Sequence, residues 1–233
     1  MSLRVLMYHS VSAAGVRDDL TVDRDRLAAQ FAALRSGGYT TLSFSDLLAL
    51  FARGAALPPR AVLVTFDDGF RDNASVAYPL ALEYGIKINL FIVPAFLMGG
   101  FYRGQPCLDR AGLRSMDPHV VEFGLHSFAH DSYGDMDLRE TADDILRCKY
   151  FMETEEIPYQ PCLAYPYGAY PRDARAMDVL GTLGIKLAFR IGNRLNPWPL
   201  PHPYLVQRMD IRGTDPAWAF KLGLRVGRKW LPL

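Results

Sequence analysis

Short apolar runs alternate with helix-like segments along this chain of 233 residues, and that alternation restricts the possible folds more than any other feature. Runs such as AVLVTF (61–66) and INLFIV (88–93) are apolar throughout, as expected for strands covered on both faces. Repeated strand–helix units predict a mostly parallel sheet wrapped by helices. Seven or eight strands in one domain favour a barrel over an open sheet, and we expect a single domain over residues 1–233.

Hydrophobic periodicity and capping signals give the expected elements. We expect strands over 4–9, 40–44, 61–66, 88–93, 120–126, 162–166, 186–190 and 205–211. We expect helices over 24–36, 46–53, 73–84 and 173–183, one from the Asp137–Glu140 capping box to about 151, and a last one opened by Asp215 and Pro216. The segment 94–118 reads as a long loop whose Phe96, Phe101 and Tyr102 cover a site.

Composition excludes several function classes. With 26 basic and 25 acidic residues, the chain has no strongly basic face for nucleic acid. Its three cysteines form no CxxC pair, which argues against a disulfide framework or a cysteine-rich zinc site. No apolar stretch is long enough to span a membrane, and the N-terminal run is too short for a secretory signal. We therefore expect a cytoplasmic protein as written, or a cell-envelope protein if a leader has been removed.

The C-terminal segment KLGLRVGRKWLPL is both basic and apolar. It fits a helix that docks on the core with its cations outward, and it also fits a helix that touches a membrane surface or an acidic partner. The sequence favours the first interpretation.

Polar and aromatic residues gather where the expected strands end. Functional residues of parallel α/β folds lie at the C-terminal ends of the strands, so these residues should share one rim. They are His9, Asp67, Asp68, His126, His130, Tyr165, Pro166 and Tyr167.

Asp67 and Asp68 are adjacent carboxylates at the end of a buried strand. The sequence Asp-Gly is typical of a turn, but two neighbouring charges also suit a cation site. His126 and His130 are spaced so that both imidazoles can reach one ion, although HxxxH alone also fits two solvated histidines. Three protein ligands leave a position open for water or substrate, as in catalytic zinc sites. Zinc suits mixed nitrogen and oxygen ligands, and cobalt, nickel or iron would also fit.

The stretches TFDDG, HSFAH and AYPYG, in that order, resemble the NodB-homology polysaccharide deacetylases, or carbohydrate esterase family 4. The resemblance spans roughly residues 61–190. It implies a distorted (β/α) barrel that removes acetyl groups from sugars with one divalent metal ion. It also implies that Asp67 is the general base and that Tyr167 donates its backbone N–H to the developing oxyanion. The implied metal ligands are Asp68, His126 and His130.

Two features depart from the common family pattern. The chain lacks the C-terminal Leu-x-His motif, and after residue 130 its only histidine is His202, in a proline-rich loop. Met7-Tyr8-His9 instead resembles the circularly permuted poly-N-acetylglucosamine deacetylases. This resemblance implies His9 as the general acid, with Met7 beside the acetyl methyl group because alternate strand residues share a side. A half-buried structural histidine is the alternative.

The second departure is a missing arginine before Pro-Tyr-Gly, where the chain has Ala164 and Tyr165. Arg190 or Arg208 would then orient Asp67, unless they form structural ion pairs. Asp72 is expected to cap the helix that follows it.

Three more residues are assigned to substrate contacts. Tyr165 and Pro166 belong to the third motif, and Trp198 would stack on a sugar ring, although loop packing is its more frequent role. The favoured function is N-deacetylation of an N-acetylglucosamine-containing glycan. The alternatives are hydrolysis of a small non-glycan amide or an O-acetyl ester, and a glycan-binding barrel without turnover.

Overall fold

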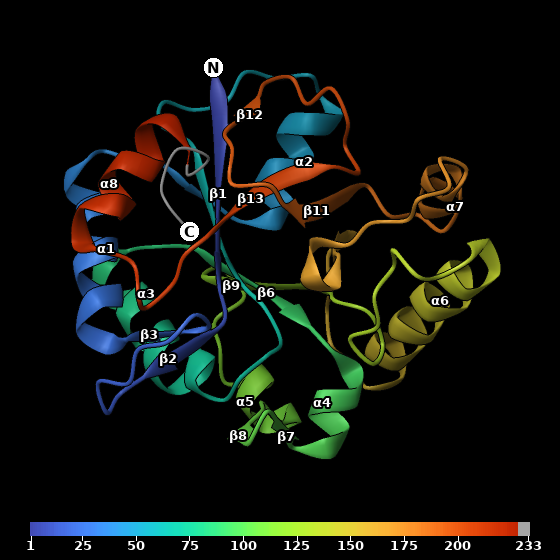
Figure 1. The fold of residues 1–233 in the computed structure, drawn as a ribbon, viewed down its shortest axis with the longest axis horizontal. Helices are drawn as coiled ribbons and strands as arrows, with labels where there is room; N and C mark the ends of the chain where they lie inside the picture. The colour runs from blue at the N-terminus through green and yellow to red at the C-terminus, as the bar shows by residue number, and fades with distance from the viewer. Residues whose placement is uncertain (228–233) are drawn as a thin grey trace.

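Within residues 1–227, which this computed structural model describes, seven parallel strands close into a barrel surrounded by helices (Figure 1). Around the barrel they are β1 (Ser2–Tyr8), β13 (Val206–Asp210), β11 (Leu187–Ile191), β10 (Cys162–Ala164), β9 (Val121–Leu125), β6 (Ile88–Ile92) and β5 (Val62–Phe66). Parallel pairing of β1 with β5 closes the ring. The predicted distorted (β/α) barrel of about seven strands is therefore confirmed.

Shorter strands decorate the barrel. They are β4 (Thr41–Leu42) beside β5, β12 (Asn196–Pro197) antiparallel to β1, the parallel pair β2 (Ser10–Ser12) and β3 (Thr21–Asp23), and the hairpin β7 (Phe101–Tyr102) and β8 (Gln105–Pro106).

Helices surround the barrel, and the short ones also lie at its rim. They are α1 (Arg24–Ser36), α2 (Phe44–Ala52), the π-helix η1 (Asn73–Ala77), α3 (Tyr78–Tyr84), α4 (Pro94–Gly99), α5 (Arg110–Arg114), α6 (Leu138–Thr154), the 3-10 turn η2 (Pro166–Gly168), α7 (Ala176–Thr182) and α8 (Ala217–Val226). No helix within residues 1–227 is both long and apolar enough to cross a membrane.

Most elements match their predicted ranges, and the differences have local causes. The helix expected over 73–84 is a π-helix followed by α3. The helix expected from Asp46 begins at Phe44, because Ser43 and Asp46 form a capping box. The predicted capping box at Asp137 and Glu140 is confirmed. Pro216, rather than Asp215, occupies the N-cap of α8.

Two apolar clusters divide the strand residues by side. Leu3 and Val5 of β1 belong to the smaller cluster, together with Phe91 and Phe189 from other barrel strands. Leu6 and Tyr8 belong to the larger cluster, which includes buried residues of the surrounding helices. Strand alternation therefore directs every second residue into the barrel. Aromatic rings fill the interior of the barrel, with Phe91 and Phe189 centroids 5.4 Å apart.

Candidate active site

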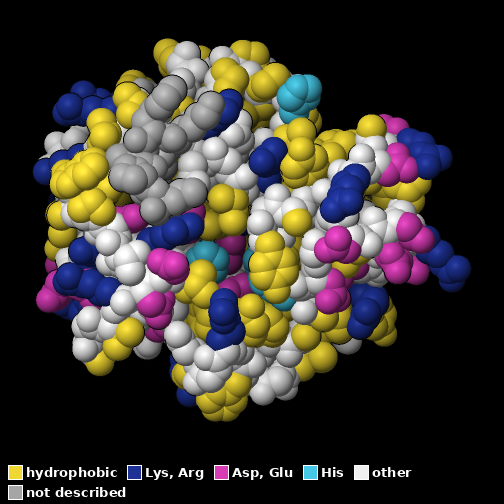
Figure 2. All heavy atoms as spheres, viewed as in Figure 1, with side chains coloured by type: hydrophobic (Ala, Val, Ile, Leu, Met, Phe, Trp, Pro, Cys, Tyr) yellow, Lys and Arg dark blue, Asp and Glu magenta, His cyan; other side chains and the backbone are white. Residues whose placement is uncertain are grey.

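A cavity of about 130 Å³ lies at the C-terminal ends of the barrel strands. Figure 2 shows histidine and acidic side chains at the base of a hollow near the middle of one face, bordered by hydrophobic side chains. The cavity is lined by Met7, His9, Leu20, Asp67, Asp68, Tyr102, Arg103, His126, His130, Tyr167, Ile191, Arg208 and Asp210.

Three of the predicted ligand residues converge in this cavity. One ligand atom from each of Asp68, His126 and His130 lies within 4.8 Å of the others. Oδ1 of Asp68 is 3.6 Å from Nε2 of His126 and 3.3 Å from Nε2 of His130. This carboxylate oxygen is buried and has no hydrogen-bond partner among the described residues. An unpaired buried anion beside two imidazole nitrogens is an arrangement that a divalent cation would complete.

The chemical states of the two histidines also fit a cation. Nδ1 of His126 lies 2.8 Å from the carbonyl oxygen of Ala164, to which it can only donate, so its Nε2 carries the lone pair that faces the carboxylates. Burial lowers the pKa of His126 to about 4 and that of His130 to about 3. Both rings are therefore neutral at pH 7, as metal ligands must be. Burial, followed by the charge of Asp67, holds the pKa of Asp68 well above its usual range.

Asp67 is held by a buried arginine. Nη1 and Nη2 of Arg208 donate to its two carboxylate oxygens at 2.5 and 2.7 Å, and both side chains are almost wholly buried. Burial raises the pKa of Asp67, but the charges of Arg208 and His126 and the hydrogen bonds from Arg208 together outweigh burial, and the pKa falls to about 2. The sequence analysis expected either Arg190 or Arg208 to orient Asp67, and in the structure it is Arg208 that holds this carboxylate. Arg190 instead lies over the ring of Tyr170.

Backbone strain is concentrated at this site. Asp68, Ser127, His130 and Tyr167 all have φ between 59° and 70°, in the left-handed region that non-glycine residues rarely adopt. Such residues cost about 1–3 kcal/mol each and persist where surrounding contacts hold them. Gly168 follows Tyr167 at φ 69°, and a Cβ there would lie 2.8 Å from Ile191. The turn that presents Tyr167 therefore needs glycine at its next position.

Asp144 of α6 holds the loop between the two histidines. Its Oδ1 accepts hydrogen bonds from Ser127 Oγ at 3.0 Å and from the Phe128 amide at 2.9 Å. Its Oδ2 accepts one from the hydroxyl of Tyr133 at 2.5 Å. Ser127 Oγ in turn accepts from the amide of Asp131. Asp144 thus fixes both residues that follow His126.

We expect Asp144→Asn to lower the affinity for a divalent cation about 10- to 100-fold, as is usual when a residue that orients metal ligands is changed. Asparagine would keep an acceptor for Ser127 and Phe128, but it would lose the charge of the carboxylate and the acceptor of the Tyr133 hydroxyl, which would have to accept instead of donate. Competition against a chelating dye would measure the affinity. Asp143→Asn, at the exposed neighbouring position, is the matched control and should leave it unchanged. Equal affinity in the two variants would contradict this role.

His9 lines the cavity together with Met7, as strand alternation predicts. Its Nδ1 is buried without a hydrogen-bond partner among the described residues, and its carbonyl oxygen accepts from Nδ2 of Asn73 at 2.9 Å. Burial lowers the pKa of His9, while the charges of Asp67 and Asp210 oppose that effect. The imidazole therefore faces two carboxylates that stabilise its protonated form.

Asp72 does not cap the helix as predicted. It occupies the N-cap of η1, but its side chain makes no capping hydrogen bond. Instead, Oδ2 accepts from Ser10 Oγ at 2.6 Å and Oδ1 accepts from Nδ2 of Asn73. This ties the segment after β1 to the segment after β5. Burial is the main cause that raises the pKa of Asp72 to about 6.

Because the pKa of Asp72 is higher in the folded chain than in the unfolded chain, the folded protein binds the extra proton between about pH 4 and pH 6. Stability should therefore fall as the pH rises through this window, by on the order of 2 kcal/mol. Asp72→Asn removes this term. Urea unfolding would give the free energy of unfolding of the variant and of the unaltered chain at pH 4 and at pH 7.5. The difference, variant minus unaltered chain, should be about 2 kcal/mol larger at pH 7.5 than at pH 4. A pH-independent difference would contradict the assignment.

The structure places three of the predicted substrate contacts outside the cavity. Tyr165 points away from the barrel interior, because it shares a side with Leu163 of β10, and it packs in the outer core. Pro166 is buried and does not line the cavity. Trp198 lies at the opposite end of the barrel, where its amide donates to the carbonyl of Met1 and its indole Nε1 donates to that of Ala55 at 2.8 Å. Its packing role, the weighed alternative, is the one observed.

Tyr167 does lie at the cavity, and its hydroxyl is 3.1 Å from Nδ1 of His130. The aromatic cover predicted from segment 94–118 is also present in part. The rings of Phe96 and Tyr102 stack with centroids 3.9 Å apart, and each lies within 6 Å of the His130 ring. Phe101 points outward and is 64% exposed. This segment forms α4, the β7–β8 hairpin and α5 rather than a plain loop.

Sequence reasoning missed Asp210 and Arg103. Asp210 ends β13 and shares a side with Arg208, so the rule that located the other site residues would have found it. Arg103 lies at the tip of the β7–β8 hairpin, and no strand pattern places a hairpin tip beside the cavity.

A family model and a curated relative both relate this chain to polysaccharide deacetylases. Residues 54–188 match the family model described as "Polysaccharide deacetylase". A protein of Bacillus subtilis (strain 168) named for the same family, YxkH, is 25% identical over 168 residues, which is 72% of this chain. The chain spans 57% of the length of that relative.

Solved structures share the fold. The Streptococcus pyogenes deacetylase PplD, in complex with acetate, superposes with a TM-score of 0.84 at 18% identity and covers 97% of this chain and 99% of its own. IcaB from Ammonifex degensii superposes with a TM-score of 0.80 at 23% identity, covering 96% and 95%. At these identities the likeness establishes the architecture of the barrel.

Proposed function

Because the chain belongs to the polysaccharide deacetylase family, we propose that it is a metal-dependent hydrolase that removes N-acetyl groups from an N-acetylglucosamine-containing glycan. The observation that carries this proposal is the convergence of Asp68, His126 and His130 beside an arginine-held Asp67 and a cavity-facing His9. Amide hydrolysis needs a base, an acid and a means to stabilise negative charge, and this cavity offers groups for each.

Asp68, His126 and His130 are the residues that would hold the cation, and zinc suits their mixed donor set. When bound, such a cation lowers the pKa of a water molecule and polarises the acetyl carbonyl. The adjacent Asp67 is not needed as a ligand. Its carboxylate is ionised throughout the working pH range, since its pKa is about 2. It would accept the proton of the attacking water, held in orientation by Arg208.

His9 would protonate the leaving amine. It lies at the end of a different strand from Asp67, so the two groups can act on different parts of the acetamido group. A lowered pKa makes the imidazolium a stronger acid, and Asp210 helps to keep that form populated. Tyr167 would contribute its backbone N–H to the oxyanion, where donors stabilise charge that develops in the transition state. Met7 would contact the acetyl methyl group.

The size of the cavity favours an acetylated carrier over a small cyclic amide. At about 130 Å³ it is smaller than sites that enclose a whole small molecule, which are typically about 300–1,000 Å³. It therefore suits an acetyl group that projects from a sugar lying across the mouth. An O-acetyl ester would fit the same space, so the bond type is decided by assay.

Acetate release from short N-acetylglucosamine oligomers, by chelator-treated protein with and without added zinc or cobalt, tests the proposal. We expect release only when metal is added. Acetate release from acetyl esters alone, or ring opening of small cyclic amides alone, would replace the proposed substrate class. Metal binding without hydrolysis of any of these substrates would support a glycan-binding barrel instead.

A further inference from the structure

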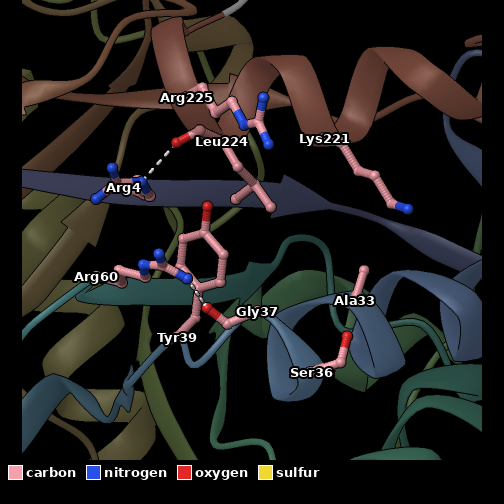
Figure 3. A pocket seen from close by; sticks show the side chains of 9 residues that line it. All are labelled: Arg4, Ala33, Ser36, Gly37, Tyr39, Arg60, Lys221, Leu224 and Arg225. Atoms are coloured by element: carbon pink, nitrogen blue, oxygen red, sulfur yellow. Dashed lines mark hydrogen bonds between the residues drawn. The ribbon is translucent and has the colours of Figure 1, made fainter.

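A second, larger cavity lies at the other end of the barrel and is strongly cationic (Figure 3). Its volume is about 430 Å³, and its lining includes Arg4, Arg60, Lys221 and Arg225, with no acidic residue from the described range 1–227. Arg4 lies near the start of β1, and Arg60 directly precedes β5. His9 and Asp67 follow the opposite ends of these same strands, so this cavity is separate from the catalytic one.

The arginines of this cavity are held in place by neutral groups. Nε of Arg4 donates to the carbonyl of Leu224 at 2.6 Å, and Arg60 donates to the carbonyl of Gly37. The ring of Tyr39 lies between them, with its centroid 5.5 Å from the guanidinium carbon of Arg4 and 5.9 Å from that of Arg60. In Figure 3 the Tyr39 hydroxyl points into the space between these side chains and α8.

Within the part of the chain that the structure describes, the positive charge of the cavity is largely uncompensated. None of its four basic side chains forms an ion pair with a carboxylate of residues 1–227. Gly37 and Leu224 lie at the C-terminal ends of α1 and α8, where each helix dipole supplies about half a negative charge. Capping of these two helices therefore accounts for only part of the four positive charges.

Helix α8 adds an exposed apolar row beside the cavity. Trp218, Leu222 and Val226 are spaced four residues apart and are 56%, 38% and 53% exposed. Phe220 and Leu224 on another face are buried in the core. The predicted docking of the C-terminal segment is thus observed for α8, while residues 228–233 of that segment lie outside the described residues. The docked helix leaves a second apolar row in contact with solvent. Lys221 and Arg225 lie on the row next to it, because residues three and four apart are neighbours on a helix.

We propose that this face of the molecule docks on a membrane surface that contains anionic phospholipids. The face comprises the cationic cavity and the row Trp218, Leu222 and Val226, and we call it the α8 face. Guanidinium and ammonium groups of the cavity bind headgroup phosphates, since arginine matches phosphate geometry with paired N–H donors. The apolar row enters the boundary between headgroups and acyl chains, as in helices that lie in the membrane interface.

Two observations favour a lipid surface over a soluble phosphate compound. A soluble anion would use the cations and leave the apolar row in water, whereas a membrane covers both. The sequence after α8 continues with Arg228, Lys229 and Trp230, which extends the same combination of basic and aromatic residues.

Vesicle co-sedimentation tests this proposal with the full chain. We expect binding to vesicles of equimolar phosphatidylcholine and phosphatidylglycerol, weakening as salt is added, and little binding to phosphatidylcholine alone. Lys221→Gln with Arg225→Gln should lower the partition coefficient roughly 30-fold, because each basic residue near an anionic surface contributes about 1 kcal/mol. Trp218→Ser with Leu222→Gln should also weaken binding while leaving its salt dependence in place.

The matched control is Arg114→Gln with Arg139→Gln, which removes the same charge from exposed positions elsewhere and should retain most of the binding. An equal loss in the control pair would reduce the effect to net charge and overturn the proposal. Titration with glycerol 1-phosphate tests whether the cationic cavity binds a soluble phosphate compound instead of a lipid headgroup. Binding of that compound with no vesicle binding would also overturn the proposal. Acetate release should be unchanged in all three double variants, so failure of vesicle binding leaves the proposed hydrolase function unaffected.

Discussion

Asp67→Asn should reduce acetate release by about 10³-fold while the protein keeps its divalent cation, because general-base catalysis typically contributes about 10²–10⁴-fold. Asparagine retains the shape of the side chain and one acceptor for Arg208, but it cannot take a proton from water. The ligand atoms of Asp68, His126 and His130 are unaltered by this change. Steady-state acetate release, together with bound metal measured by atomic absorption, would give both quantities.

Asp68→Asn is the matched comparison for this prediction, since it changes the adjacent carboxylate in the same way. It should lower metal binding and activity together, and excess metal should restore part of the activity. The Asp67 variant should gain nothing from excess metal. If the two variants behaved alike, or if Asp67→Asn remained fully active, the separate roles of these neighbours would be wrong.

Arg208→Met should destabilise the fold by about 3–5 kcal/mol, because removing one partner of a buried ion pair leaves an uncompensated charge. Arg208 is fully buried and makes two short hydrogen bonds to Asp67, which is itself buried. Its guanidinium carbon also lies 5.3 Å from the centroid of Phe91, which helps to form the apolar floor below the cavity. Methionine fills much of the volume, so the expected loss is mainly electrostatic. Urea unfolding at pH 7 would measure it.

The double variant Asp67→Asn with Arg208→Met separates the ion pair from packing. Removing both charges together should recover a large part of the lost stability, since a buried pair replaced by neutral groups is often close to neutral in free energy. Activity should remain low, because the base is absent. A double variant as unstable as Arg208→Met alone would show that packing, rather than the unpaired carboxylate, causes the loss. Arg190→Met, which removes the arginine that lies over Tyr170, is the control.

Strand alternation accounts for both the successes and an avoidable error of the sequence analysis. Leu63 belongs to the inner cluster, so Thr65 and Asp67, at positions two and four further along the chain, also face inward. The same count places His9 inside, two residues after Met7. Applied to CLAYP, it places Tyr165 outside, on the side of Leu163, and so argues against the substrate role given to Tyr165.

The sequence by itself determined the barrel and the rim on which the candidate site lies. Both follow from local rules, because a buried parallel strand must be apolar and its C-terminal end must lead into a loop at one edge. Asp67 and Asp68 could be found in this way because they directly follow β5, and His126 because it directly follows β9, with His130 four residues further along the same loop.

Only the tertiary structure decided which arginine holds Asp67. Arg208 belongs to β13, which pairs with β1 and β11 and not with β5, so it reaches Asp67 across the interior of the closed barrel. The distance between the Arg208 guanidinium and the Asp67 carboxylate depends on how the seven strands close into a barrel, and no local sequence pattern encodes that closure. Tertiary structure likewise placed Trp198 against Ala55 at the far end and left the Trp218 row of α8 exposed. The chain specifies which side of an element is apolar, but closure of the barrel determines which of those sides find a partner.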